Sequence, residues 1–229
     1  MSIHLQNDLE SIKKKVLIMG GLVEEALRSS ATSIVARNPD LAEQVIEQDA
    51  NVDKLQLELD DLCLKVLALH QPVAADLRFI TAILKITNDL ERIGDLAVNL
   101  SKRALLLKGI PKSEDPVDIE RMVDAASTML RDSLDSLVRG DSKLARAVCT
   151  RDDVVDDMLR ENISILLERM KLSPANVDSA EALISASRII ERMGDLATNI
   201  AEDVVFLVEA VDIRHPYLTK RMEPTSRSR

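Results

Sequence analysis

One short segment occurs twice in this chain, and it constrains the possible folds more than any other feature. The ten residues ERIGDLAVNL at 91–100 return as ERMGDLATNI at 191–200, with seven positions identical. The other three positions exchange residues of similar size. A repeat offset by 191 − 91 = 100 residues in a chain of 229 predicts two similar units, each of ordinary domain size.

The composition predicts that both units are helical. Hydrophobic residues make up 46% of the chain and charged residues 30%, whereas there are only 6 glycines and 7 prolines. Scarce turn residues and abundant charged and aliphatic residues are typical of long amphipathic helices. We therefore expect an all-α fold.

Proline and glycine mark the predicted helix ends, because proline lacks a backbone N–H and glycine favours the residue after a helix. They divide the chain into six helical segments, at 3–37, 40–69, 73–107, 116–138, 141–171 and 175–210. Short connections make successive long helices antiparallel. The prediction is two three-helix bundles in tandem, formed by residues 1–110 and 111–213, followed by a flexible tail at 214–229.

Several classes of function are disfavoured by composition. The net charge of −9, aromatic content of 1% and absence of tryptophan argue against nucleic-acid binding, which needs basic surfaces and stacking side chains. No apolar run approaches the roughly 20 residues of a membrane span, so we expect a cytoplasmic protein without direct membrane insertion. Cys63 and Cys149 lie among apolar neighbours and are interpreted as reduced core thiols.

Acidic residues form stripes on the predicted helices. Residues four apart share one helix face, which groups Glu91, Asp95 and Asn99 on one helix and Asp49 with Asp53 on the preceding one. The second unit repeats this set with Asp152, Asp156, Glu191 and Asp195. The predicted core positions of the third helix lie opposite the stripe, at Ile83, Ile86, Leu90, Ile93 and Ala97. The stripes should therefore face outward.

Two interpretations of the stripes are open from the residues alone. Charged helical proteins often have a solvated acidic face, which would need no ligand. However, like charges four residues apart destabilise a helix by about 0.2–0.5 kcal/mol, so an acidic set present twice suggests a compensating cation. Such clustered carboxylates suit hard cations such as Mg, Ca, Mn or Fe.

Residues beside the stripes also have two interpretations. Gly94 and Gly194 are unfavourable inside helices, and a close approach by the neighbouring helix would explain them. Gly20-Gly21 has a similar explanation, or marks a bend. Arg92 and Arg192 either offset the acidic charge or hold a phosphate oxygen.

Motifs of catalysis are missing from the sequence. It has no Glu-x-x-His pair of the di-iron bundles, which disfavours oxidase chemistry. It has neither a glycine-rich phosphate loop nor a Gly-x-Ser-x-Gly elbow, and no residue stands out as general acid or base. The sequence alone therefore assigns no catalytic residue.

A family resemblance becomes visible in several motifs. They are Ala75-Asp76-Leu77-Arg78, the two Glu-Arg-x-Gly-Asp-Leu-Ala-x-Asn segments, Asn199-Ile200-Ala201-Glu202 and Arg214-His215-Pro216. Over about residues 3–216 the chain resembles the PhoU family of bacterial phosphate-signalling regulators. The resemblance implies two tandem three-helix bundles, a cytoplasmic homodimer and no enzymatic activity.

The resemblance also implies sites and partners. It places multinuclear clusters of divalent or trivalent metal (Fe, Mn, Mg or Zn) at Asp49, Asp53, Glu91, Asp95, Asp152, Asp156, Glu191 and Asp195. It implies negative regulation of the phosphate-starvation (Pho) two-component response and of phosphate uptake. The implied partners are the ATPase of the phosphate ABC transporter and the phosphate sensor histidine kinase.

Two departures from the family pattern leave questions open. Leu96 and Leu196 stand where many relatives have histidine, so the metal identity is not fixed. The second unit lacks Ala-Asp-Leu-Arg, which leaves the occupancy of its site open. The alternative function is a metal-dependent hydrolase of phosphorylated substrates that uses the surface carboxylates.

Overall fold

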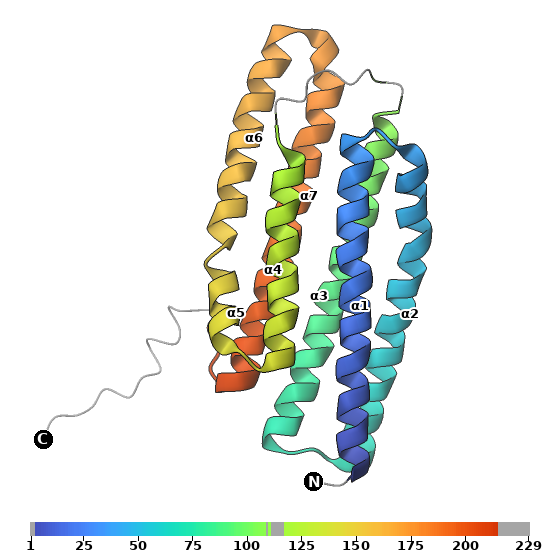
Figure 1. Cartoon of the computed structure of the whole chain (residues 1–229), viewed down its shortest axis with the longest axis vertical. Helices are drawn as coiled ribbons and strands as arrows, with labels where there is room; N and C mark the ends of the chain where they lie inside the picture. Colours follow the sequence, from blue (N-terminus) through green and yellow to red (C-terminus); the bar gives the residue numbers. More distant parts are fainter. Residues whose placement is uncertain (1–2, 109, 111–116, 215–229) are drawn as a thin grey trace, which may run out of the picture.

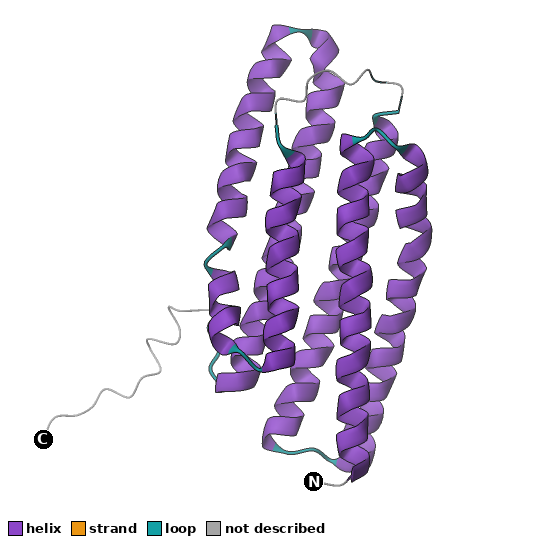
Figure 2. Ribbon diagram, viewed as in Figure 1, coloured by secondary structure: helices purple, strands orange, loops and turns teal. Residues whose placement is uncertain are grey.

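Long helices form almost all of the structure, a computed structural model that describes residues 3–108, 110 and 117–214 (Figures 1 and 2). The helices are α1 (Ile3–Val35), α2 (Pro39–His70), α3 (Ala74–Leu106), α4 (Ile119–Arg139), α5 (Ser142–Cys149), α6 (Asp152–Leu172) and α7 (Val177–Glu209), with a 3₁₀ turn at Pro174–Asn176. No strand occurs within the described ranges. The all-α prediction is confirmed.

Side chains close the predicted helix ends. The Asn38 carboxamide oxygen accepts a hydrogen bond from the Leu41 N–H at 3.1 Å, and Pro39 takes the first position of α2. Asp141 does the same for α5, and Gly140 ends α4 with a φ of +62°, where the lack of a Cβ avoids strain. These caps explain why the helices end near the proline and glycine residues that marked the predicted helix ends.

The fifth predicted helix, 141–171, is wrong as one element, because the structure divides it into α5 and α6. At the break, the Arg151 N–H donates to the Val148 carbonyl and the Val154 N–H to the Arg151 carbonyl, three residues back instead of four. The Thr150 hydroxyl also donates to the Ala147 carbonyl at 2.9 Å. Asp152 and Asp153 then occupy the first turn of α6, where the helix dipole favours negative charge.

Two helical layers lie side by side, one of three helices and one of four (Figure 1). Helices α1, α2 and α3 pack together, while α7 packs against α4, α5 and α6. Between the layers, α3 runs along α7 and α1 along α4. The five core positions predicted for α3 are all fully buried: Ile83, Ile86, Leu90, Ile93 and Ala97. One continuous apolar core extends through both layers.

The α1–α4 contact explains the first glycine of the Gly20-Gly21 pair. A Cβ built on Gly20 would lie 2.4 Å from Leu134 Cδ1, whereas one on Gly21 would meet nothing within 4 Å. Ion pairs flank this crossing, between Arg28 and Asp124 at 3.3 Å and between Arg131 and Glu24. A close helix crossing is therefore the correct interpretation of Gly20.

The predicted unit boundaries fall next to residues that are not described. Residues 111–116 and 215–229 lie outside the described ranges, so the division at 110/111 and the flexible tail at 214–229 stay predictions.

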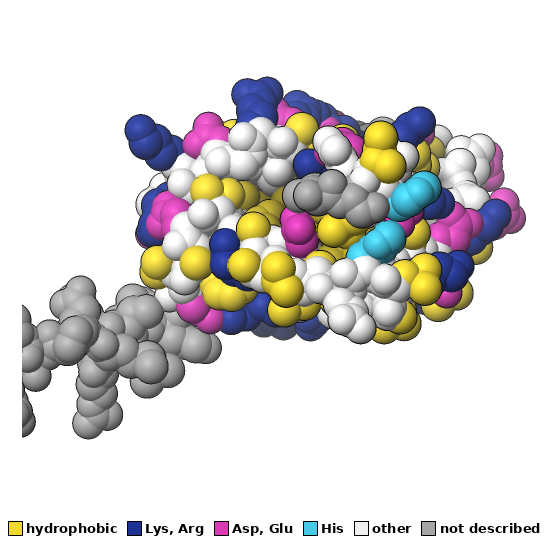
Figure 3. All heavy atoms as spheres, turned by 90° about the horizontal axis from the view of Figure 1, so that it is seen from below, with side chains coloured by type: hydrophobic (Ala, Val, Ile, Leu, Met, Phe, Trp, Pro, Cys, Tyr) yellow, Lys and Arg dark blue, Asp and Glu magenta, His cyan; other side chains and the backbone are white. Residues whose placement is uncertain are grey.

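The lower end of the molecule exposes apolar side chains among charged and polar ones (Figure 3). Leu69 and Val73, in and after the last turn of α2, have exposed fractions of 75% and 73%. His70 lies beside them, and its Nε2 is 2.9 Å from Asp8 Oδ2. None of the described helices combines the length and the apolar character that crossing a membrane would require.

Candidate metal centres and the groove between the repeats

Three carboxylates of the second unit converge at one point. Asp156 on α6 and Glu191 and Asp195 on α7 each offer an oxygen, and these atoms all lie within 4.8 Å of one another. Helices α6 and α7 pack side by side, so residues one turn apart on each bring their side chains to the same surface. The convergence of the stripes predicted for this unit is thus confirmed for these three residues.

Asp152 stands beside this group, at the start of α6. The Thr198 hydroxyl donates a hydrogen bond to Asp152 Oδ1 at 3.3 Å. Burial and the neighbouring Asp195 and Asp156 nevertheless raise the pKa of Asp152. Desolvation and Asp195 likewise raise the pKa of Glu191. The neighbouring carboxylates therefore disfavour one another's charged forms, which Arg192 offsets only in part.

The first unit places Asp49 and Asp53 of α2 opposite Glu91 and Asp95 of α3. Burial, Asp53 and Asp95 raise the pKa of Asp49, and burial followed by Asp95 raises that of Glu91. The four groups thus repel one another, as in the second unit. Within the described residues, however, only Asp156, Glu191 and Asp195 meet the 4.8 Å spacing for a shared ion.

The motif glycines differ between the two units. A Cβ on Gly94 would lie 3.1 Å from Asp49 Oδ1 and 3.4 Å from Val52 Cγ1, so α2 approaches α3 closely there. The nearest atom to a Cβ on Gly194 would be Val155 Cγ1 at 3.7 Å, an ordinary contact. The close-approach interpretation is therefore confirmed for Gly94 and does not apply to Gly194.

The donor set fits a hard cation. Both clusters offer carboxylate oxygens, which Mg²⁺, Mn²⁺ and iron accept, and each cluster combines half-buried and exposed residues. The raised pKa values of Glu191 and Asp195 show that burial and mutual repulsion disfavour the charged forms. A bound cation would remove that repulsion.

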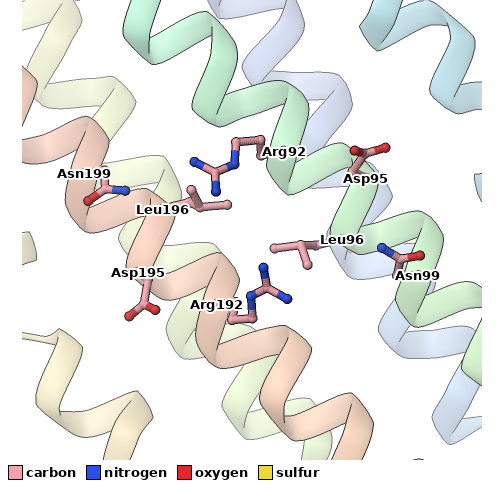
Figure 4. A pocket seen from close by; sticks show the side chains of 8 residues that line it. All are labelled: Arg92, Asp95, Leu96, Asn99, Arg192, Asp195, Leu196 and Asn199. Carbon is pink, nitrogen blue, oxygen red and sulfur yellow. The ribbon is translucent and has the colours of Figure 1, made fainter.

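The repeated motifs also meet each other across a pocket of about 290 Å³ between α3 and α7 (Figure 4). It is lined by the same four residue types from each helix: Arg92, Asp95, Leu96, Asn99, Arg192, Asp195, Leu196 and Asn199. Figure 4 shows Arg92, Arg192, Leu96 and Leu196 pointing into the gap, while Asp95 and Asp195 point to its outer sides. The sequence placed both arginines beside the stripes but did not reveal this inter-repeat pairing.

The two cysteines are structural. Cys63 is fully buried, and burial raises the pKa of its thiol to about 12. Cys149 is half-buried, and desolvation raises its thiol pKa to about 11. Thiols with such pKa values are poor nucleophiles at neutral pH.

Comparison with known proteins gives one consistent result. The family model described as the PhoU domain matches residues 16–104 and 119–204. A Pseudomonas putida protein named phosphate-specific transport system accessory protein PhoU homolog is 37% identical over 218 residues, covering 94% of this chain and 84% of its own. The Escherichia coli protein named phosphate-specific transport system accessory protein PhoU is 34% identical, covering 91% and 86%.

Solved structures agree with the fold. The crystal structure of PhoU from Pseudomonas aeruginosa superimposes with a TM-score of 0.85 at 33% identity, covering 90% of this chain and 99% of that one. The crystal structure of the phosphate transport system regulatory protein PhoU from Streptococcus pneumoniae gives a TM-score of 0.83 at 25% identity, covering 91% and 99%.

Proposed function

This chain belongs to the PhoU family, and from that membership we propose that it is a regulatory accessory protein of a phosphate-specific transport system. The observation that carries the proposal is the relatives' match over almost their full length: the Pseudomonas putida protein is covered to 84% and is named as such an accessory protein. The family model also matches two segments of this chain, residues 16–104 and 119–204.

The proposed action is negative regulation. When phosphate is plentiful, the protein would restrain the phosphate-starvation response and phosphate uptake by contacting the transporter ATPase and the sensor histidine kinase. The exposed apolar end at Leu69 and Val73 supports protein contacts, because apolar side chains gathered at a surface commonly mark interaction sites. Self-association into a homodimer and a cytoplasmic location belong to the same proposal.

The carboxylate clusters are proposed to hold divalent or trivalent cations. In the second unit, Asp156, Glu191 and Asp195 would supply the oxygens, with Asp152 beside them. In the first unit, Asp49, Asp53, Glu91 and Asp95 would do so. The cation would supply electrostatic stabilisation of a rigid acidic surface, which suits a docking protein that performs no chemistry.

A hydrolase acting on phosphorylated substrates is the alternative. It would need an arginine and a metal to approach the same phosphate group. In Figure 4, Arg92 and Arg192 point into the gap between α3 and α7, whereas Asp95 and Asp195 point away from it. This divergence favours the regulatory function.

A binding experiment tests the proposal. The tagged full-length chain is used to co-purify the transporter ATPase and the sensor kinase from cells grown in high and in low phosphate. We expect recovery of at least one partner, and loss of regulation in a Pho-promoter reporter strain that lacks the protein. The proposal would be refuted if neither partner were recovered in either medium and the reporter activity were the same with and without the protein. Turnover of a phosphate ester with added Mn²⁺ or Mg²⁺ would instead support the hydrolase.

A further inference from the structure

A second groove, of about 520 Å³, continues from the inter-repeat pocket along the end of α3 and the start of α7. Its lining consists of Leu96, Asn99, Lys102, Arg103, Leu106, Ser185, Arg188, Ile189 and Arg192. Four of these side chains are basic and none is acidic. Figure 4 shows where the groove begins, with Leu96 and Arg192 reaching toward each other from the two helices.

The internal repeat provides a comparison for this groove. Because α3 and α7 correspond at an offset of 100 residues, each lining position has an equivalent at the other end of the α3–α7 contact. The equivalents of Lys102, Arg103, Arg188 and Arg192 are Glu202, Asp203, Asn88 and Arg92. Only one of the four basic positions is thus basic in both repeats. The basic groove is a property of one end alone, not a by-product of the duplicated helix.

Charges at the two ends are compensated differently. At the acidic end, Lys85 Nζ is 3.0 Å from Asp203 Oδ1, and Arg92 Nη1 is 3.7 Å from Asp89 Oδ1. In the groove, none of the four basic side chains has a carboxylate oxygen within 4.0 Å among residues 3–108, 110 and 117–214. Lys102 and Arg192 act on carboxylates of the metal clusters only from beyond that distance.

Unpaired cations in one groove repel one another, and a chain of net charge −9 has ample acidic residues that could have paired with them. An external anion would compensate them. Arginine guanidinium groups match phosphate oxygens in paired hydrogen bonds, which favours phosphate groups over a carboxylate-bearing or halide ligand of lower charge. Four cations call for more than one phosphate group.

The groove also has an apolar part. Leu106 has an exposed fraction of 62%, and Ile189 is half-buried beside the basic side chains. A ligand pocket of this kind commonly combines apolar walls with a few charged groups that fix orientation. A long nucleic acid is disfavoured because the chain has a net charge of −9 and almost no aromatic side chains for stacking.

We propose that the groove formed by Lys102, Arg103, Arg188 and Arg192 binds a polyphosphorylated small anion. The phosphate groups contact the four basic side chains, and Leu106 and Ile189 accept an organic portion where the ligand has one. The ligand is a nucleoside polyphosphate or a short inorganic polyphosphate. The apolar wall predicts tighter binding of the nucleotide. The groove adjoins the carboxylate clusters, but none of their carboxylates lines it, and its proposed ligand does not depend on the proposed regulatory partners.

Isothermal titration of the full-length chain tests the proposal with three probes: adenosine triphosphate, inorganic tripolyphosphate and inorganic orthophosphate. We expect the two polyphosphates to bind, with affinity that falls as salt rises, and orthophosphate to bind much more weakly. The double variant R103S/R188S should raise the Kd for either polyphosphate about tenfold or more, because each lost charge-assisted hydrogen bond contributes about that factor. All metal-cluster carboxylates remain in this variant, so anion binding through a metal would be unaffected.

The matched control is R139S, which removes an exposed arginine at the end of α4, outside the groove. It should leave the Kd unchanged. Tighter binding of adenosine triphosphate than of tripolyphosphate would identify a nucleotide as the ligand, and equal binding would identify an inorganic polyphosphate. Absence of binding by both, or an R103S/R188S protein of native helicity that binds as the wild type does, would overturn the proposal. If the double variant loses helicity, R188S alone provides the same comparison at an exposed position.

Discussion

Gly94 of α3 lies so close to Asp49 of α2 that a Cβ at position 94 would come within 3.1 Å of Asp49 Oδ1. The glycine that allows the two helices to pack therefore also sets the position of a candidate metal ligand. Its counterpart Gly194 lacks this constraint, because the nearest atom to a Cβ there would be 3.7 Å away. The pair gives a direct comparison of the two units.

The first prediction concerns these glycines. Gly94→Ala should displace the Asp49 carboxylate and lower the metal content of the first cluster, with a net loss of stability of about 1 kcal/mol from overpacking. Gly194→Ala should keep its metal and gain up to about 1 kcal/mol, since alanine favours the helix. Elemental analysis and thermal unfolding of both variants measure the difference. Equal effects of the two substitutions would contradict the role given to Gly94.

The second prediction concerns repulsion in the second cluster. Asp195→Asn removes one of three converging carboxylates, so metal content should fall toward half of the wild-type value if both clusters are loaded. Without metal, the same variant should be slightly more stable than the wild type, by about 0.5 kcal/mol, because a repulsive charge is gone.

Unfolding in EDTA and in added Mn²⁺ tests this effect. The variant should be more stable than the wild type in EDTA and less stable than the wild type in Mn²⁺. Asp157→Asn is the matched control, since Asp157 is exposed on α6 and pairs with Arg160. A variant that unfolds globally in both solutions would indicate that Asp195 serves packing and does not bind metal.

The third prediction is a pH dependence at the contact between the repeats. Burial raises the pKa of Asp89 from 3.8 to about 6, against the opposing attraction of Arg92. Because the folded state binds this proton more tightly than the unfolded state, the group's contribution to stability falls as pH rises from about 4 to 6 and stays low above that.

Asp89→Asn removes this dependence and should stabilise the protein by about 2 kcal/mol at pH 7.5, with little effect at pH 4. Urea unfolding at several pH values, with the exposed Asp61→Asn as control, provides the measurement. A variant that is less stable than the wild type at pH 7.5 would show that the ion pair with Arg92 outweighs the cost of burying Asp89.

The fourth prediction tests how α1 and α4 join the two layers. Gly20→Val should destabilise the fold by about 1–3 kcal/mol, because its side chain would displace Leu134. Gly21→Val, one residue along the same helix and facing open space, should be neutral or stabilising by a few tenths of a kcal/mol. Thermal unfolding of the two variants distinguishes a close crossing from a general intolerance of side chains in this part of α1.

The sequence predicted what repeats along a single helix. The period of Ile83, Ile86 and Leu90 identified the buried face of α3. The four-residue spacing of Glu191 and Asp195 identified the acidic face of α7. Both depend on local geometry, which a helical period determines. Helix ends could also be predicted from the sequence, because Asn38 and Gly140 cap the helices that directly adjoin them.

Features that depend on contacts between helices far apart in the chain could not be predicted from the sequence. The basic groove needs Arg103 of α3 and Arg188 of α7 to line the same space, and no period within either helix indicates that arrangement. The break after Cys149 was missed for another reason. No proline or glycine stands at Thr150 or Arg151 to indicate a helix end. The break instead involves a side chain that competes for a backbone carbonyl, as the Thr150 hydroxyl does at Ala147.

That break makes the two halves of a duplicated molecule unequal. Asp49 and Asp53 lie well inside the continuous helix α2, whereas Asp152 is the first residue of α6 and faces the positive end of its peptide dipoles. The corresponding carboxylates of the two units would therefore bind a cation in different local electrostatic fields. The two proposed sites would fill over different ranges of metal concentration, so that one chain would respond in two steps and not at a single threshold.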